Sequence, residues 1–288
     1  MILQENYRLS NNVLIPKLGL GTWFIKDEVA AQAVQDAISI GYRHIDTAQA
    51  YGNEAGVGEG VRTCGIEREE IFVTTKLDAG IKSYKEAVES IDGSLKKMGL
   101  EYVDLMIIHS PQPWQNFGEE DRYAVGNREA WRALEQAYQA GKLRSIGVSN
   151  FLQQDIDNLL ASCSVKPMVN QILAHISNTP HDLIEYCKAQ DIVVEAYSPV
   201  GHGVLLANET IVELANKYGV SVPQLCIRYT LQLGLLPLPK TANPHHMRNN
   251  AELDFVISDA DMAFLTNIES IKDYGEASVF PVYGGKMR

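Results

Sequence analysis

Four residues in the first half of the chain have the side chains needed to protonate a carbonyl oxygen: Asp46, Tyr51, Lys76 and His109. A tyrosine phenol has an ordinary pKa of about 10, which is too high for easy acid–base work near neutral pH. A neighbouring Lys76 ammonium would stabilise the tyrosinate and lower the pKa of Tyr51. Asp46 would hold Lys76 in place, and His109 would donate a hydrogen bond that orients the substrate oxygen. This set favours proton transfer to a polarised oxygen.

Other chemistries are less well supported by the residues. The sequence has no HxH pair, no HExxH motif and no carboxylate cluster at these positions, so we expect no metal site. A Ser-His-Asp triad lacks the GxSxG motif that usually carries its nucleophile. Lys76 alone would also suit a Schiff-base lyase or aldolase, and the residues leave this alternative open. The glycine-rich stretch 56–60 has the wrong spacing for a dinucleotide-binding loop, and we interpret it as the first turns of a helix.

Eight short apolar segments are the elements that would position these side chains. Most are apolar throughout, which is typical of parallel strands buried on both faces. Helical patterns lie between them, and the unit repeats about every 30 residues, the size of a βαβ unit. The even spacing favours one (β/α)₈ barrel (TIM barrel) domain over residues 1–288, rather than an open sheet. The predicted strands are 18–22, 43–46, 71–76, 102–109, 144–149, 168–172, 192–197 and 235–238.

Two features extend this barrel prediction. Residues 7–9 and 13–15 flank a polar turn and predict an N-terminal β-hairpin that plugs the bottom of the barrel. Polar residues stand at or just after the ends of the apolar strands, and in such a barrel the carboxyl ends of the strands form the active-site face. We therefore expect these side chains to converge on one mouth: Asp46, Lys76, His109, Ser149, Asn150, Asn170, Gln171, Tyr197 and Lys240.

Composition limits the partners and the location of the protein. The net charge is −11, which argues against nucleic-acid binding. The longest apolar runs are too short to span a membrane, and the first residues do not resemble a secretory signal peptide. The four cysteines form no CxxC pair, which is typical of a reduced cytoplasmic protein. Nothing in the sequence indicates an additional interface, so we expect a monomer.

Seven motifs in order give the chain a clear resemblance. From about residue 18 to 261 it resembles the aldo-keto reductase family, and it is similar to bacterial aldehyde and ketone reductases such as the 2,5-diketo-gluconate reductases. The motifs are GYRHIDTAQAYGNE (41–54), IFVTTKL (71–77), DLMIIHSP (104–111), GVSNF (147–151), VNQI (169–172), EAYSPVG (195–201) and LPKTANP (238–244), followed by Arg248 and Asn250.

The resemblance implies NADPH-dependent reduction of aldehydes or ketones in a (β/α)₈ barrel. It implies a catalytic tetrad of Asp46, Tyr51, Lys76 and His109, with Tyr51 as the general acid. Hydride would come from the cofactor, while the protein supplies position and electrostatics. The implied cofactor contacts are Ser149, Asn150 and Gln171 to the nicotinamide carboxamide, Tyr197 stacked on the ring, Thr22, Trp23, Ser198, Pro199, Val200 and Gly201 along the dinucleotide, Lys240 and Thr241 at the 2′-phosphate, and Asn250 at the adenine.

One position departs from the family pattern. An arginine that usually contacts the 2′-phosphate is replaced by His246. Histidine has neither the bidentate fork nor the permanent charge of arginine. We therefore expect a weaker, pH-dependent preference for NADPH with NADH also accepted, and partial compensation by Arg248.

The substrate pocket is expected to lie between loop 110–125 and the tail after residue 271, because loops carry specificity on this scaffold. We expect Trp23, His109, Trp114 and Tyr283 to line it. The physiological substrate stays open, from aliphatic and aromatic aldehydes to keto-sugars. The main alternative is a non-catalytic protein that senses a nicotinamide cofactor, and the intact tetrad argues against it.

Overall fold

The computed structural model describes residues 1–286, so residues 287–288 of the predicted 1–288 barrel lie outside the described part. Eight parallel strands form one sheet in the order β10-β9-β8-β7-β6-β5-β4-β3, and the predicted (β/α)₈ barrel is confirmed. The strands are β3 (Leu20–Gly21), β4 (His44–Asp46), β5 (Phe72–Leu77), β6 (Leu105–Ile108), β7 (Ile146–Ser149), β8 (Val169–Leu173), β9 (Val193–Tyr197) and β10 (Leu236–Leu238).

The first and last strands close the barrel through a short seam. The backbone N–H of Gly19 donates to the Pro237 carbonyl at 3.2 Å, and that of Gly21 donates to the Pro239 carbonyl at 3.0 Å. A Cβ on Gly19 would lie 2.7 Å from Nδ1 of the buried His44 ring, so a glycine suits this close approach. A single parallel bridge between Gly21 and Lys240 completes the seam.

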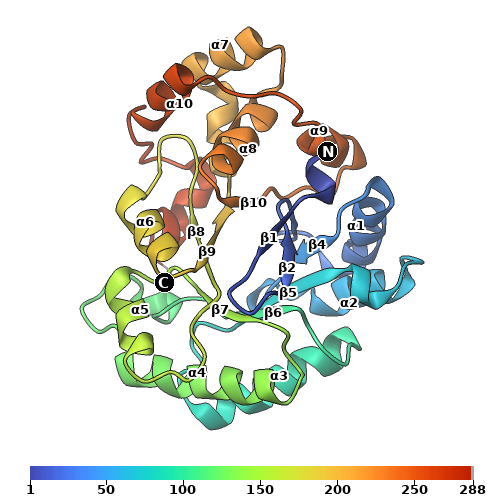
Figure 1. The fold of residues 1–288 in the computed structure, drawn as a ribbon, viewed down its shortest axis with the longest axis vertical. Coiled ribbons are helices and arrows are strands. Elements are labelled where there is room, and N and C mark those ends of the chain that lie inside the picture. Colours follow the sequence, from blue (N-terminus) through green and yellow to red (C-terminus); the bar gives the residue numbers. More distant parts are fainter. Residues whose placement is uncertain (287–288) are drawn as a thin grey trace.

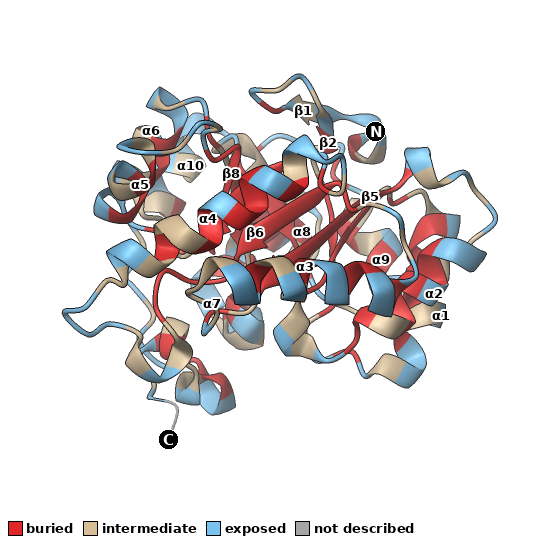
Figure 2. Ribbon diagram, turned by 90° about the horizontal axis from the view of Figure 1, so that it is seen from below, coloured by how far each residue is buried: buried red, intermediate tan, exposed pale blue. Residues whose placement is uncertain are grey.

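Helices surround the strands in Figure 1, and Figure 2 shows buried strands beneath helices with exposed outer faces. This arrangement follows from amphipathic helices that bury one face against the sheet. The helices are α1 (Asp27–Ile40), α2 (Glu54–Thr63), α3 (Tyr84–Met98), α4 (Ala124–Gln139), α5 (Gln153–Leu160), α6 (His181–Ala189), α7 (Glu209–Tyr218), α8 (Val222–Gln232), α9 (Pro244–Ala251) and α10 (Asp259–Thr266). Short 3₁₀ helices span Ile2–Gln4, Gln49–Tyr51, Arg68–Glu70, Trp114–Asn116, Gly201–Ala207, Gly275–Val279 and Pro281–Tyr283.

The glycine-rich stretch 56–60 lies in α2, which confirms the helix interpretation. Its glycines allow α2 to pack unusually close to its neighbours. A Cβ on Gly56 would lie 2.2 Å from the Asp27 carbonyl of α1, and a Cβ on Gly58 would lie 2.1 Å from the Met98 carbonyl of α3. These glycines therefore serve helix packing.

The N-terminal hairpin pairs β1 (Asn6–Arg8) antiparallel with β2 (Leu14–Pro16), as predicted. The Tyr7 hydroxyl donates to the Leu235 carbonyl at 3.3 Å, and the Asn11 amide donates to the Arg144 carbonyl at 2.9 Å. Both acceptors precede a barrel strand, so the hairpin covers the amino-terminal end of the barrel.

The predicted strand at 102–109 is longer than the observed β6 (Leu105–Ile108). Tyr102 lies before the strand, with its ring 4.2 Å from the guanidinium group of Arg68 and 5.9 Å from that of Arg144. The next carboxylate, Asp104, is buried and pairs with both arginines.

No helix within residues 1–286 combines the length and the apolar character that crossing a membrane requires.

Candidate active site

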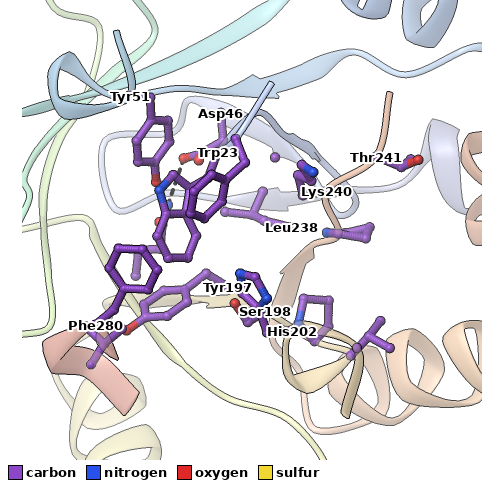
Figure 3. Close-up of a pocket in the computed structure, with 18 of the residues that line it drawn as sticks. Trp23, Asp46, Tyr51, Tyr197, Ser198, His202, Leu238, Lys240, Thr241 and Phe280 are labelled. Atoms are coloured by element: carbon purple, nitrogen blue, oxygen red, sulfur yellow. Dashed lines mark hydrogen bonds between the residues drawn. The ribbon is translucent and has the colours of Figure 1, made fainter. Parts of the chain in front are cut away.

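A cavity of about 610 Å³ opens at the carboxyl ends of the strands. It is elongated, with Tyr51, Trp23 and Phe280 at one end and Lys240 and Thr241 at the other (Figure 3). The predicted site residues that line it are Trp23, Asp46, Tyr51, His109, Trp114, Ser149, Asn150, Gln171, Tyr197, Ser198, Pro199, Val200, Lys240, Thr241, His246 and Asn250. Lys76 lies just below the wall, and Thr22, Gly201, Arg248 and Tyr283 are not among the lining residues.

Lys76 contacts two of the other predicted catalytic residues, Asp46 and Tyr51. It is fully buried on β5, and its ammonium donates to Oδ2 of Asp46 at 2.6 Å and to the Tyr51 hydroxyl at 3.2 Å. A third hydrogen bond goes to the Thr47 carbonyl at 2.9 Å. β4 carries Asp46, and the 3₁₀ helix Gln49–Tyr51 places the phenol over the ammonium. The strand ends therefore bring the acid, the lysine and the carboxylate together.

The pKa of Tyr51 is raised overall, so the lowering effect predicted for the Lys76 ammonium does not prevail. Burial of the phenol, followed by the negative charge of Asp46, raises the pKa of Tyr51 well above its ordinary value. Asp46 also pairs directly with Lys76, which offsets the field of the ammonium at the phenol oxygen. Tyr51 therefore holds its proton firmly and is available as a donor.

His109 follows β6 and lies edge-on to both Tyr51 and Trp114, with ring centroids 5.7 Å and 5.0 Å away. Burial, and secondly the charge of Lys76, lower the pKa of His109 well below its ordinary value. The imidazole is therefore neutral and has one N–H to donate. Its Nδ1 is buried without a partner among the described residues, while the ring faces the cavity.

A second polar cluster lies at the ends of β7, β8 and β9. The Ser149 hydroxyl donates to the Gln171 backbone carbonyl at 2.8 Å, and the Tyr197 hydroxyl donates to Oδ1 of Asn150 at 2.7 Å. Asn150 in turn donates to the His109 carbonyl at 3.0 Å. The cluster thus holds amide and hydroxyl groups rigidly beside an aromatic ring, as binding of a planar carboxamide requires.

Sequence reasoning missed two buried titratable residues below this cluster. Glu195 on β9 accepts a hydrogen bond from Nε2 of Gln171 at 2.7 Å, and His44 on β4 lies 3.8 Å from its other oxygen. A signal was present, because a charged residue in the middle of the apolar segment 192–197 has no surface to face.

Aromatic side chains form the end of the cavity that contains Tyr51. Trp23 packs against Phe280 and His202, with ring centroids 4.9 Å and 5.5 Å away. Phe24 and His202 also line the cavity and were not predicted as site residues. Tyr283 lies behind this wall, where its hydroxyl hydrogen-bonds Oγ of Ser198 at 2.6 Å.

Backbone strain gathers around the same cavity. Phe24, Asn150, Ser198 and His202 line it and have positive φ angles of 62°, 60°, 51° and 55°. Such angles cost energy in residues other than glycine and tend to occur at functional sites.

The far end of the cavity has a basic character. Lys240 and His246 are exposed there, Thr241 is half-buried, and Asn250 is buried on α9. Arg248 is exposed on α9 outside the lining. A cavity with amides at one end and cations at the other fits an elongated anionic dinucleotide.

Within residues 1–286, no cluster of three or more histidine, cysteine or acidic residues is placed to hold a metal ion.

Comparison with known proteins gives a consistent result. The sequence model of the Aldo/keto reductase family matches residues 17–270. The chain is 40% identical over 262 residues to a glyoxal reductase of Bacillus subtilis, a match that covers 90% of this chain and 91% of the relative. It is 38% identical over 272 residues to a 9,11-endoperoxide prostaglandin H2 reductase of Trypanosoma cruzi, covering 93% and 92%.

Solved structures of aldo-keto reductases also match this chain in sequence and in fold. An aldo/keto reductase from Brucella melitensis is 36% identical with a TM-score of 0.85, covering 92% of this chain and 99% of that one. A Bombyx mori aldo-keto reductase in complex with NADP is 34% identical with a TM-score of 0.84, covering 95% of each chain. The chain belongs to the aldo/keto reductase family, whose members are nicotinamide-dependent oxidoreductases that act on small carbonyl compounds.

Proposed function

We propose that this protein is an NADPH-dependent reductase of aldehydes and ketones, with Asp46, Tyr51, Lys76 and His109 as its catalytic tetrad. The observation that carries the proposal is the position of the Tyr51 hydroxyl, 3.2 Å from the Lys76 ammonium at the wall of the elongated cavity. A proton donor that opens into a ligand cavity, with a buried ion pair behind it, suits protonation of a carbonyl oxygen.

Each member of the tetrad has a separate task. Bound NADPH supplies hydride to the carbonyl carbon. Tyr51 gives its proton to the carbonyl oxygen, and its raised pKa keeps it protonated until that transfer. The Lys76 ammonium, held by Asp46, then stabilises the tyrosinate. Neutral His109 donates its N–H to the substrate oxygen and orients it.

The cofactor roles follow the lining of the cavity. Ser149, Asn150 and Gln171 hold the nicotinamide carboxamide, and Tyr197 stacks on the ring. Lys240 and Thr241 bind the 2′-phosphate, with His246 and Arg248 nearby and Asn250 at the adenine. Trp23, Ser198, Pro199 and Val200 line the path of the dinucleotide, next to Thr22 and Gly201 in the chain. NADPH is preferred, but histidine in place of arginine at 246 weakens this preference, so NADH is also accepted.

The substrate is a small carbonyl compound that fits between aromatic walls. Trp23, Phe24, Trp114 and Phe280 surround the space above Tyr51. Such walls favour compounds with an apolar or aromatic body. The similarity to a glyoxal reductase of Bacillus subtilis makes small dicarbonyls a sensible part of any substrate panel.

The geometry of Lys76 argues against Schiff-base chemistry. Its amine is buried, makes three hydrogen bonds and is absent from the cavity lining. A Schiff-base lysine needs a free amine that reaches the substrate carbon.

Tyr51→Phe tests the proposal. Removing the acid should lower kcat by about 10²-fold to 10⁴-fold while NADPH affinity stays close to that of the wild type. The measurement is oxidation of NADPH and NADH with a carbonyl panel, alongside NADPH binding by fluorescence. Similar turnover in the variant would refute the role of Tyr51. Tight NADPH binding by the wild type without turnover of any carbonyl would favour the cofactor-sensing alternative.

A further inference from the structure

The side-chain amide of Gln171 is held by two carboxyl groups at once. Its Nε2 donates to Oδ1 of Asp46 at 2.9 Å and to Oε2 of Glu195 at 2.7 Å. An amide nitrogen has two hydrogens, so both donors are used. The Gln171 carbonyl oxygen therefore has a fixed direction, and the residue lines the cavity.

The two carboxyl groups that hold Gln171 are not equivalent. Asp46 forms an ion pair with Lys76 at 2.6 Å. Glu195 is fully buried, has no lysine or arginine partner among the described residues, and leaves Oε1 without a hydrogen bond. A buried carboxylate without a cation is costly, whereas a carboxylic acid at the same place is tolerated.

The charges around Glu195 favour the acid form. From β4 it faces the Asp46 carboxylate and His44, from β5 the Lys76 ammonium, and on β10 it pairs with apolar Leu236. Burial raises the pKa of Glu195 to about 8, with Asp46 as the second cause, and the Gln171 hydrogen bond and Lys76 oppose the rise. His44 gives no positive charge, because burial lowers its pKa to about 3.

We propose that Glu195 is a positioning residue, a neutral carboxylic acid that together with Asp46 fixes the amide of Gln171 for the nicotinamide carboxamide. The inference rests on the proposed function. Two acceptors below Gln171 turn its carbonyl oxygen toward the cavity, where it accepts a hydrogen bond from the carboxamide NH₂ group. Because the acid is uncharged, the Asp46–Lys76 pair below the ring stays balanced.

This role has an electrostatic consequence for cofactor choice. Ionised Glu195 would add a negative charge beneath the nicotinamide site. Only the oxidised nicotinamide ring carries a positive charge, so ionisation should strengthen binding of NADP⁺ relative to NADPH. The neutral acid therefore favours the reduced cofactor, which a carbonyl reductase uses.

Binding titrations test the positioning role without turnover. Glu195→Leu removes the acceptor for Gln171 and should weaken NADPH about tenfold, whereas Glu195→Gln keeps an acceptor oxygen and should bind like the wild type at pH 7. Adenosine 2′,5′-bisphosphate, which lacks the nicotinamide, should bind all three proteins equally. Glu54→Gln is the matched control, because Glu54 is also a buried carboxylate but contacts Thr75 and Lys97.

The pH dependence tests the neutral state. Between pH 6 and 9.5 the preference of the wild type should shift toward NADP⁺ by about fivefold, with no such shift in Glu195→Gln. In the free protein, folding holds a proton on Glu195 that the unfolded chain releases above about pH 4.3. Stability from this group is thus present at low pH and lost as the pH rises through about 8, so wild type should lose stability relative to Glu195→Gln.

The outcomes separate the two proposals. Equal NADPH affinity in wild type and Glu195→Leu would overturn the positioning role, and identical pH profiles in wild type and Glu195→Gln would overturn the neutral acid. Either result leaves the reductase proposal standing if the wild type still turns over carbonyls with NADPH. Failure of the wild type to bind any nicotinamide cofactor would instead remove the proposed function itself.

Discussion

Lys240 and His246 are exposed basic residues at the end of the cavity where we expect the cofactor phosphate. A lysine offers a point charge, and a histidine offers a charge only when protonated. Discrimination between NADPH and NADH should therefore depend mainly on Lys240. A permanent charge at position 246 should increase the preference for NADPH.

Two substitutions at this end should move cofactor preference in opposite directions. Lys240→Ala should weaken NADPH about 10-fold to 100-fold and leave NADH nearly unchanged, because a charge-assisted hydrogen bond is lost. His246→Arg should raise the preference for NADPH about tenfold, because arginine binds phosphate with a bidentate fork. Dissociation constants for both cofactors check this. Equal losses for NADPH and NADH in Lys240→Ala would show that Lys240 does not contact the phosphate.

Polar residues at strand ends predict the catalytic face, and Asp46, Lys76 and Gln171 do meet there. The same logic misses Glu195, because its role depends on partners from other strands that the sequence does not place. Tyr283 shows a different limit. Its aromatic character suits a pocket wall, but the fold of the tail turns its hydroxyl toward Ser198 instead.

Among the elements, α2 is a helix whose position depends on glycines, because a Cβ on them would clash with neighbouring helices. Gly58 of α2 touches the backbone of α3, whereas Gly93 of α3 is exposed and a Cβ there would meet no atom within 4 Å. The first glycine is needed for packing between helices. Gly93 only increases the conformational entropy of the unfolded chain and lowers the helix propensity of α3.

These two glycines form a matched pair for a stability test. Gly58→Ala should destabilise the protein by about 1–3 kcal/mol, because Cβ clashes with the Met98 carbonyl. Gly93→Ala should stabilise it by about 0.5–1 kcal/mol through better helix propensity. Urea unfolding of both variants measures the difference. A stable Gly58→Ala protein would mean that α2 can shift away from α3 at little cost.

Element types were predictable from the sequence because apolar strands and helical periods alternate so regularly. Strand ends were harder to place. β3 is only Leu20–Gly21, shorter than the predicted 18–22, since the seam with β10 consists of few hydrogen bonds. At 102–109 the strand begins only at Leu105, and the guanidinium groups of Arg68 and Arg144 near the Tyr102 ring come from positions that the local pattern does not place.

For the whole molecule, the seam between β3 and β10 and the ligand cavity coincide. Gly21, Leu238 and Lys240 belong to the seam and also line the cavity. A dinucleotide along this cavity would contact both sides of the seam and link the first barrel strand to the last. Cofactor binding should therefore stabilise the closed barrel as a unit.

Thermal unfolding with cofactor tests this expectation. NADPH at about 100 times its Kd should raise the free energy of unfolding by about 2.7 kcal/mol, because it binds only the folded state. For a chain of this size, with an unfolding entropy of about 0.6 kcal/mol/K, that corresponds to an increase in Tm of roughly 4–5 °C. Adenosine 2′,5′-bisphosphate at the same saturation is the control for mass action. An unchanged Tm at saturating NADPH would show that the cofactor does not bind the folded barrel in preference to the unfolded chain.

The position of the cavity at one end of the barrel limits how ligands enter and leave. Because side chains fill the barrel interior and β1 and β2 cover its amino-terminal end, cofactor and substrate must both use the mouth at the carboxyl ends of the strands. Ser149 and Gln171 lie deep in the barrel, whereas Trp114 and Phe280 are half-buried above them. A carbonyl compound that arrived first would obstruct the path of the nicotinamide. Turnover should therefore follow a compulsory order, with NADPH first in and NADP⁺ last out.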